Sequence, residues 1–186
     1  MKRFLLIFWL VIGTSTFSIR AQDAEVILGL ELGASSISVE PEFKPQDVDI
    51  DYDGYVFGYI FGYRFESDLV VEGNISYSSN DSFFRSFDNY ELIESKALLG
   101  YSFEVKDNFR IVPMIGFSHW ELETREGAFL NSGPEEELEF EGTDLTYKIR
   151  LDFPVGELVV LSLSYANTNV EFGRNELTQF GIKFEF

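Results

Sequence analysis

The feature that most constrains this chain is a strict alternation of apolar and polar residues in eight separate segments. Successive side chains of a β-strand point to opposite faces, so each segment predicts a strand with one apolar and one polar face. No segment repeats every 3.6 residues, so the mature chain is predicted to be all-β. In the last segment, residues 177–186, the two alternating sets are Phe180, Ile182, Phe184, Phe186 and Gln179, Gly181, Lys183, Glu185. The other segments are residues 24–33, 54–65, 69–78, 92–103, 109–118, 144–153 and 158–166.

The first 21 residues differ from the rest of the chain. Lys2 and Arg3 precede an apolar run from Phe4 to Ile12, and small and polar residues follow up to Ala21. This pattern predicts a secretory signal peptide over residues 1–21 and one domain over residues 22–186. A membrane anchor is the alternative, but the run has about half of the ~20 residues that a spanning helix needs. The chain has no Cys, which excludes an acylated lipoprotein and a disulfide-stapled scaffold.

The connections between the segments alternate in length. Short links at residues 66–68, 104–108 and 154–157 alternate with long links at residues 38–51, 79–89, 121–142 and 167–176. All the short turns therefore lie at one end of the predicted sheet and all the long loops at the other. This arrangement is typical of an up-and-down antiparallel barrel.

Alternation alone does not distinguish a soluble carrier barrel from a membrane barrel. Two features favour the membrane. The polar face is rich in Gly and Ser with isolated charges of both signs, which suits a narrow lumen. The apolar face carries aromatic residues toward both strand ends, for example Phe184 and Phe186 at one end and Phe117 and Tyr165 toward the other. Aromatic girdles around an aliphatic band mark the two bilayer interfaces. Strands of about ten residues match a tilted crossing of a bilayer. The sequence thus predicts an eight-stranded antiparallel up-and-down transmembrane β-barrel.

The signal peptide, the alternating links, the PMIGFS stretch of residues 113–118 and the terminal FGIKFEF of residues 180–186 resemble the eight-stranded outer-membrane barrels of the OmpA/OmpX kind from Gram-negative bacteria. The resemblance implies periplasmic termini, extracellular long loops, a monomer, and contact with outer-membrane lipid and lipopolysaccharide. It also implies that the last strand closes on the first. The barrel-assembly machinery would then recognise Phe180, Ile182, Phe184 and Phe186.

The inward face carries a nearly balanced set of charges. An eight-stranded barrel is just wide enough for its own side chains, and an unpaired buried charge is costly. The lumen is therefore predicted to be an ion-paired plug. Loop midpoints predict that Glu72 lies opposite Lys96 and diagonal to Arg64. The full set is Glu31, Glu72, Glu94, Asp152 and Glu185 with Arg64, Lys96, Arg110, Lys148, Arg150 and Lys183.

These features predict a structural or surface-interaction protein, acting in envelope integrity, adhesion or host-factor contact through long acidic loops. A narrow porin-like channel is the alternative, and a lipid-modifying enzyme is a further one. The net charge of −18 argues against nucleic acid as a partner. The single His, His119, follows Ser118, and neighbours on a strand face opposite ways, so the two form no dyad. No catalytic residue and no cofactor are expected.

Acidic residues alternate with apolar ones beyond the predicted spans. Parity places the acids outward and the apolar residues, with Trp120, inward as a cap over the outer mouth. Outward acids facing each other are candidates for Ca²⁺ or Mg²⁺, which prefer oxygen ligands. An EF-hand is excluded, because the position that needs a Glu holds Ile60. The weak divalent-cation candidates are Asp47, Asp49, Asp51, Asp53, Glu137, Glu139 and Glu141.

Overall fold

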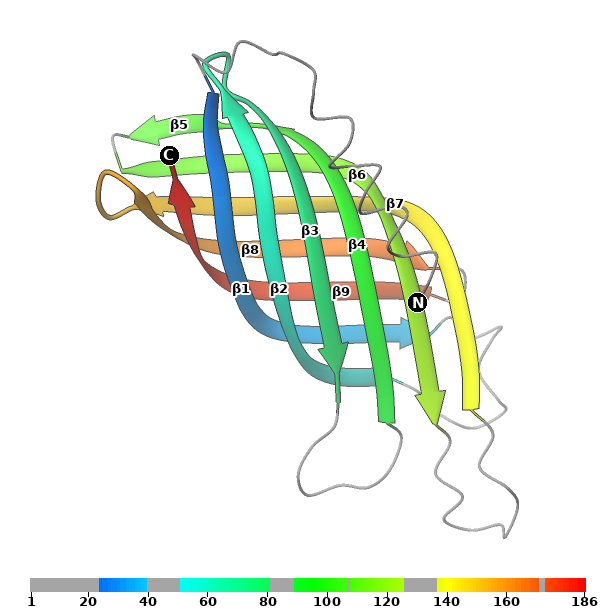
Figure 1. Cartoon of the computed structure of the whole chain (residues 1–186). Helices are drawn as coiled ribbons and strands as arrows, with labels where there is room; N and C mark the ends of the chain where they lie inside the picture. Colours follow the sequence, from blue (N-terminus) through cyan, green and yellow to red (C-terminus); the bar gives the residue numbers. More distant parts are fainter. Residues whose placement is uncertain (1–23, 40–50, 81–88, 107, 126–136, 171–172) are drawn as a thin grey trace, which may run out of the picture.

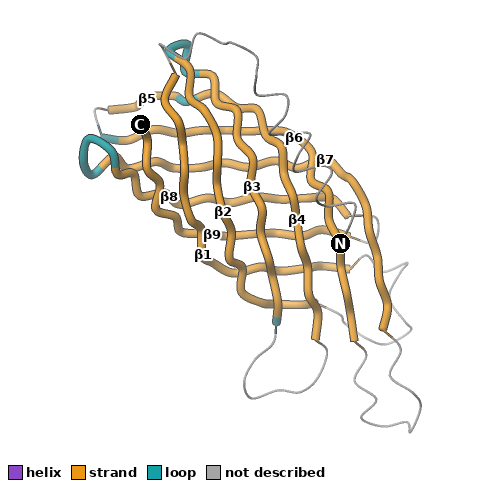
Figure 2. The backbone as a smooth tube through the Cα atoms, viewed as in Figure 1, coloured by secondary structure: helices purple, strands orange, loops and turns teal. Residues whose placement is uncertain are grey.

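A computed structural model of the chain shows a closed antiparallel β-barrel (Figure 1). It describes residues 24–39, 51–80, 89–106, 108–125, 137–170 and 173–186. Figure 2 shows that strands make up nearly all of this described backbone, and no helix occurs in it. None of the described residues therefore belongs to a helix long and apolar enough to cross a membrane.

Nine strand segments occupy eight positions around the barrel. Both β4 and β5 pair with β6, and the two are separated only at Ser102, so they form one barrel strand. Apart from the pair of the first and last strands, every pairing joins barrel strands that are antiparallel neighbours in chain order. The segments are β1 Ala24–Val39, β2 Asp51–Phe65, β3 Leu69–Ser79, β4 Asn89–Tyr101, β5 Phe103–Lys106, β6 Phe109–Arg125, β7 Glu137–Pro154, β8 Val159–Val170 and β9 Gly173–Glu185.

The last strand closes the barrel against the first, as predicted. β9 pairs with β1 from Ile27 opposite Glu185 to Val39 opposite Gly173. The pairing continues through the final residue, since the Phe186 N–H donates to the Val26 carbonyl at 3.0 Å and the Val26 N–H donates to the Phe186 carbonyl at 2.9 Å. The C-terminus lies at the same end of the barrel as the turns at 66–68 and 155–158 (Figure 1).

Most strands are longer than the sequence pattern predicted, mainly at the end of the long links. β6 has 17 residues and β7 has 18. The prediction of a long loop at residues 167–176 is wrong, because β8 ends at Val170 and β9 begins at Gly173, paired with each other. The polar residues of this stretch bond across the hairpin and into the lumen: Asn167 Nδ2 donates to Glu176 at 3.3 Å and Asn175 Nδ2 donates to Glu94 at 2.9 Å.

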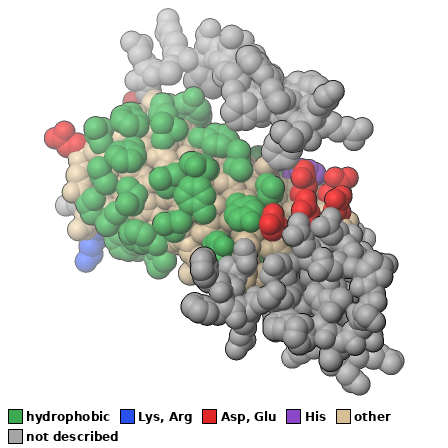
Figure 3. All heavy atoms as spheres, turned by 60° about the horizontal axis from the view of Figure 1, so that its bottom comes forward, with side chains coloured by type: hydrophobic (Ala, Val, Ile, Leu, Met, Phe, Trp, Pro, Cys, Tyr) green, Lys and Arg blue, Asp and Glu red, His purple; other side chains and the backbone are tan. Residues whose placement is uncertain are grey.

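The two faces of the barrel divide the side chains as the alternation predicts. Large apolar side chains stay exposed on the outside, for example Leu32 at 60% and Phe117 at 63%. Figure 3 shows these side chains gathered over the barrel wall and a group of acidic side chains at one end of it. Charged and small polar residues are buried inside together with three small apolar clusters. Such an apolar exterior around a polar interior is the inverse of a soluble protein and suits a bilayer.

Candidate functional site: the lumen and the outer rim

All eleven predicted lumen charges point inward, and ten of them are buried, while Arg64 is half-buried. The centre of the network lies on β7. Lys148 Nζ donates to both carboxylate oxygens of Glu31, at 3.0 and 2.9 Å, and to Glu72 at 3.1 Å. The Arg150 guanidinium also binds Glu72. Glu31 accepts further hydrogen bonds from Asn74 Nδ2 and Ser164 Oγ, so its charge is fully compensated.

The network continues from β7 toward the C-terminal end of the barrel. Arg150 Nε donates to Asp152 at 2.9 Å, and Lys183 Nζ donates to the other Asp152 oxygen at 2.6 Å. Lys183 also lies 3.5 Å from Glu185. Acids and bases alternate at each step, so every buried charge here has at least one opposite partner.

At this end of the barrel, Glu25 joins the network although it was not among the predicted lumen charges. Glu185 pairs with Arg110 at 2.8 Å and with Arg64 at 3.2 Å. Arg64 binds Glu25 as well. Glu25 supplies the sixth acid for the six bases of the lumen set. Its parity with Ile27 and Glu31 along β1 was the available signal.

Farther along the lumen, Glu94 and Lys96 form a separate pair. Lys96 Nζ donates to Glu94 at 2.7 Å and to Ser76 at 3.2 Å. Glu94 also accepts from Ser118, Thr168 and Asn175, at 3.2, 3.1 and 2.9 Å. Neutral donors therefore supply most of the hydrogen bonds to this carboxylate.

The predicted register between β3 and β4 is wrong by two residues. Glu72 lies opposite Leu98, and Lys96 lies opposite Asn74. Arg64 lies opposite Val70, which places Glu72 diagonal to it as predicted, but its guanidinium pairs with Glu25 and Glu185. The partners of Glu72 come instead from β7, on the far side of the barrel, because the lumen is narrow enough for side chains to meet across it.

Beyond Glu94, a cluster of buried apolar side chains lies inside the barrel, and we call it the apolar cap. The cap brings Trp120 and Leu122 inward, as parity predicted, and adds residues from β1, β4 and β8. The Trp120 Nε1–H donates to Asp144 at 2.7 Å, and the Tyr90 hydroxyl bonds the Ser35 hydroxyl at 2.6 Å. The cap consists of Ile37, Tyr90, Leu92, Trp120, Leu122 and Val170.

Outside the cap, acids line two cross-strand rows of the rim. Glu121 lies opposite Glu141, and Glu123 lies opposite both Glu139 and Glu91. Among the other cation candidates Asp53 is exposed, whereas Asp47, Asp49 and the side chains of Asp51 and Glu137 lie outside the described residues. Within the part of the chain that the structure describes, no three acidic or His side chains converge as a metal site. A cation at this rim stays a prediction.

The only His and its neighbour lie on opposite faces of β6, as predicted. Ser118 is buried in the lumen, where its hydroxyl donates to Glu94. His119 points outward, and its side chain is 40% exposed. These two residues therefore share no chemistry.

The model of the outer membrane protein beta-barrel domain family matches residues 7–186. The chain belongs to this family. It is a membrane protein of the bacterial outer membrane, as the resemblance to OmpA/OmpX-like barrels implied. No curated protein matches it in a sequence comparison.

Solved barrels share the fold at low sequence identity. Neisserial surface protein A (NspA) superimposes with a TM-score of 0.69 at 14% identity, over 89% of this chain and 100% of that one. Ail, the attachment invasion locus protein of Yersinia pestis, gives 0.64 at 14% identity over the same shares. The N-terminal barrel of Pseudomonas aeruginosa OprF gives 0.55 at 17% identity, again over 89% and 100%.

Proposed function

We propose that this protein is a closed barrel that presents its strand extensions and loops at the outer surface of the cell, where it supports the envelope or contacts an external partner. This role requires neither a cofactor nor a catalytic residue. The observation that supports the proposal is that buried ion pairs lie along the lumen and that the buried apolar cap lies beyond them.

The ion pairs leave no free charge to conduct ions through the described lumen. Each acid from Glu31 to Glu185 holds at least one base, and small hydroxyl and amide groups fill the remaining space. Separating a buried pair costs about 3–5 kcal/mol. A narrow porin-like channel would need several of these pairs to open together.

The cap adds an independent barrier. Trp120, Tyr90 and Leu92 are nearly inaccessible, with exposed fractions of 1%, 0% and 2%. An apolar constriction excludes ions because it cannot replace their hydration. The same packing holds β4, β6 and β8 together where they extend beyond the charged lumen.

The outward acids of the rim suit cationic partners. One structure of Ail, with a TM-score of 0.60 at 15% identity, holds the heparin analogue sucrose octasulfate. A sulfated polyanion does not suit the present rim, where five outward glutamates crowd β4, β6 and β7. We therefore favour a basic surface, or Ca²⁺ and Mg²⁺ that bridge the acids to lipopolysaccharide phosphates.

The proposed orientation places the 66–68 and 155–158 turns and the C-terminus in the periplasm, and the acidic rim outside. The barrel-assembly machinery would recognise the β9 strand, and the barrel would act as a monomer. Protease treatment of intact cells is expected to cleave an epitope inserted at residues 126–136 and to spare one inserted at Gly156.

Planar-bilayer recording of the purified protein tests the closure. The closed barrel is expected to be electrically silent across the physiological voltage range. Trp120→Ala combined with Glu72→Ala, which opens both barriers, is expected to produce discrete conductance steps. A wild-type protein with a steady open-pore conductance would overturn the proposal and favour the channel.

A further inference from the structure

A row of three polar side chains crosses the outside of the barrel between the apolar belt and the acidic rim. Ser95 on β4 lies opposite His119 on β6, and His119 lies opposite Thr143 on β7. Directly opposite residues of an antiparallel sheet have Cβ atoms about 5 Å apart. All three side chains are at least partly exposed on the lipid-facing side.

Within this row, His119 connects a hydroxyl to a carboxylate. Its Nδ1 lies 3.1 Å from Thr143 Oγ1, and its Nε2 lies 3.7 Å from Glu121 Oε1. With the Nε2–H directed at Glu121, the Nδ1 lone pair accepts the Thr143 hydroxyl hydrogen. This is the order of nucleophile, base and orienting carboxylate by which a hydroxyl is activated. The Nε2–Glu121 distance exceeds that of a hydrogen bond, but catalytic hydrogen bonds are often longer when no substrate is bound.

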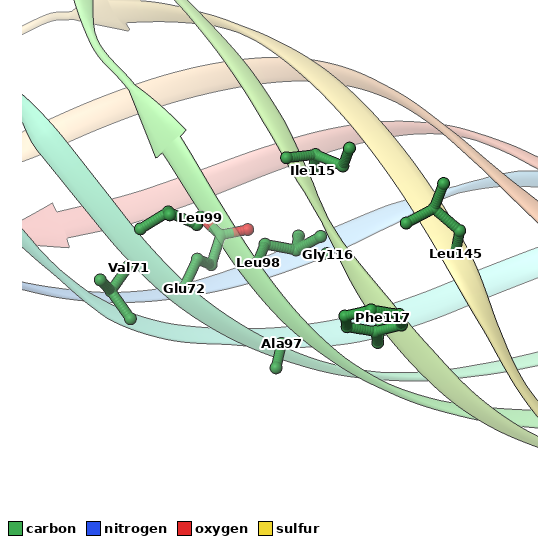
Figure 4. A pocket seen from close by; sticks show the side chains of 9 residues that line it. All are labelled: Val71, Glu72, Ala97, Leu98, Leu99, Ile115, Gly116, Phe117 and Leu145. Carbon is green, nitrogen blue, oxygen red and sulfur yellow. The ribbon is translucent and has the colours of Figure 1, made fainter.

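An apolar groove of about 490 Å³ lies in the barrel wall, and Figure 4 shows the residues that line it. Two of the groove residues lie close to the row. On β6, Phe117 is two residues before His119, and on β7, Leu145 is two residues after Thr143. Two residues span about 7 Å along a strand. The small side chain of Ala97 on β4 leaves room between its larger neighbours. The outward side chains that line the groove are Val71, Ala97, Leu99, Ile115, Phe117 and Leu145, and Glu72, Leu98 and Gly116 complete the lining.

The groove is continuous with the lipid-facing belt, so hydrocarbon is what it meets in the membrane. A lipid chain lying in it would bring its polar end to the level of His119 and Thr143. The bond found at that level in membrane lipids is the acyl ester. The groove thus fits the hydrocarbon chain of a lipid, and the polar row fits its ester group.

We propose that Thr143, His119 and Glu121 hydrolyse a long-chain acyl ester of a membrane lipid bound in this groove. Thr143 Oγ attacks the ester carbonyl while His119 Nδ1 takes its proton, and that proton then passes to the departing alcohol oxygen. Water then attacks the acyl-Thr143 ester while His119 takes its proton, and His119 returns that proton to Thr143 Oγ as the fatty acid leaves. Glu121 stabilises the imidazolium that forms at each proton transfer.

This activity goes beyond the proposed surface role and departs from the expectation of no enzyme. That expectation weighed His119 only with Ser118. Thr143 is 24 residues away from His119 in sequence, and only the β6–β7 register brings the two together.

The test measures fatty acid released by the purified barrel reconstituted in vesicles. One arm contains diacyl phospholipid alone and the other adds lipopolysaccharide, so the released chains identify the lipid that is cut. Thr143→Val and His119→Gln are each expected to lower the rate at least about 100-fold. Thr178→Val, at another exposed position on the outer wall, is the matched control and is expected to keep the wild-type rate.

The groove has its own test. Ala97→Phe fills it and is expected to lower release of long chains at least about tenfold while sparing a soluble acetyl ester. Ala34→Phe, the same exchange at an exposed outward alanine of β1, is expected to change neither. Heat-modifiable migration confirms that each variant folds. Release no faster than from protein-free vesicles, or release unaffected by Thr143→Val, would overturn the proposal. Both outcomes are independent of conductance, so they leave the closed-barrel proposal standing.

Discussion

Glu72 illustrates how single residues hold the lumen closed. It is 1% exposed, and its carboxylate is bound by Lys148 and Arg150 from the opposite wall. Removing the acid leaves two cations with one partner each, Glu31 and Asp152. The loss is therefore electrostatic as well as steric.

Glu72→Ala is expected to lower the free energy of unfolding by about 3–5 kcal/mol, because it leaves buried charge uncompensated. Adding Arg150→Met should recover part of that loss, since Asp152 keeps Lys183 as its partner. Urea titration of the refolded barrel in lipid vesicles measures both effects. Lys96→Met is the control for Arg150→Met, because Lys96 binds Glu94 and not Glu72. Its effect on the free energy of unfolding should add to that of Glu72→Ala without any rescue. A rescue by Lys96→Met that equals the rescue by Arg150→Met would contradict the cross-lumen pairing.

At the scale of elements, the β6–β7 pair carries both the cap and the outer row. Trp120 fits only because Gly142 faces it, since a Cβ at Gly142 would lie 2.5 Å from Trp120 Cζ2. The same register places Thr143 beside His119 on the outer face. One strand pair therefore positions Trp120 of the cap on its inner face and the proposed lipid site on its outer face.

Gly142→Val is expected to displace the Trp120 ring and destabilise the barrel by about 1–3 kcal/mol. The chain has two Trp, Trp9 and Trp120, so a protein expressed from residue 22 onward has Trp120 as its single tryptophan. Its emission should shift to the red and become more accessible to acrylamide. Gly156→Val is the matched control, because nothing lies within 4 Å of a Cβ at that position. Unchanged emission in Gly142→Val would show that the cap does not depend on this contact.

The side chain of Phe186, the final residue, is expected to speed assembly of the barrel into the outer membrane. Phe186→Asp keeps the backbone hydrogen bonds to Val26 but removes an apolar side chain from the rim. It is expected to slow the appearance of the heat-modifiable folded band in outer-membrane fractions. Phe153→Asp changes an outward Phe at the same end of the barrel, outside the last strand. Equal defects in the two variants would assign the effect to the lipid interface and not to recognition of β9.

For the whole molecule, the fold was predictable because alternation is a local signal. Each strand's inward and outward sets could be assigned from parity alone, including the inward Trp120 and Leu122. The partners inside the lumen were not predictable, because they depend on the stagger of all eight strands. The two-residue error at Glu72 and the missed Thr143–His119 contact both arise from register, which the sequence specifies only through the folded barrel.

The charge of the whole rim leads to the final prediction. Like charges directly opposite each other destabilise a sheet pair, and Glu121–Glu141 and Glu123–Glu139 are two such pairs. Millimolar Ca²⁺ or Mg²⁺ is expected to raise the melting temperature of the barrel in lipopolysaccharide-containing vesicles, whereas Na⁺ at equal ionic strength is not, because only a divalent ion bridges two carboxylates or a carboxylate and a phosphate. Changing Glu137, Glu139 and Glu141 to Gln should abolish the difference, while changing Glu66, Glu104 and Glu157, which are exposed at the opposite end, should leave it intact. If divalent and monovalent salts raise the melting temperature alike, the rim acids act only as screened surface charge.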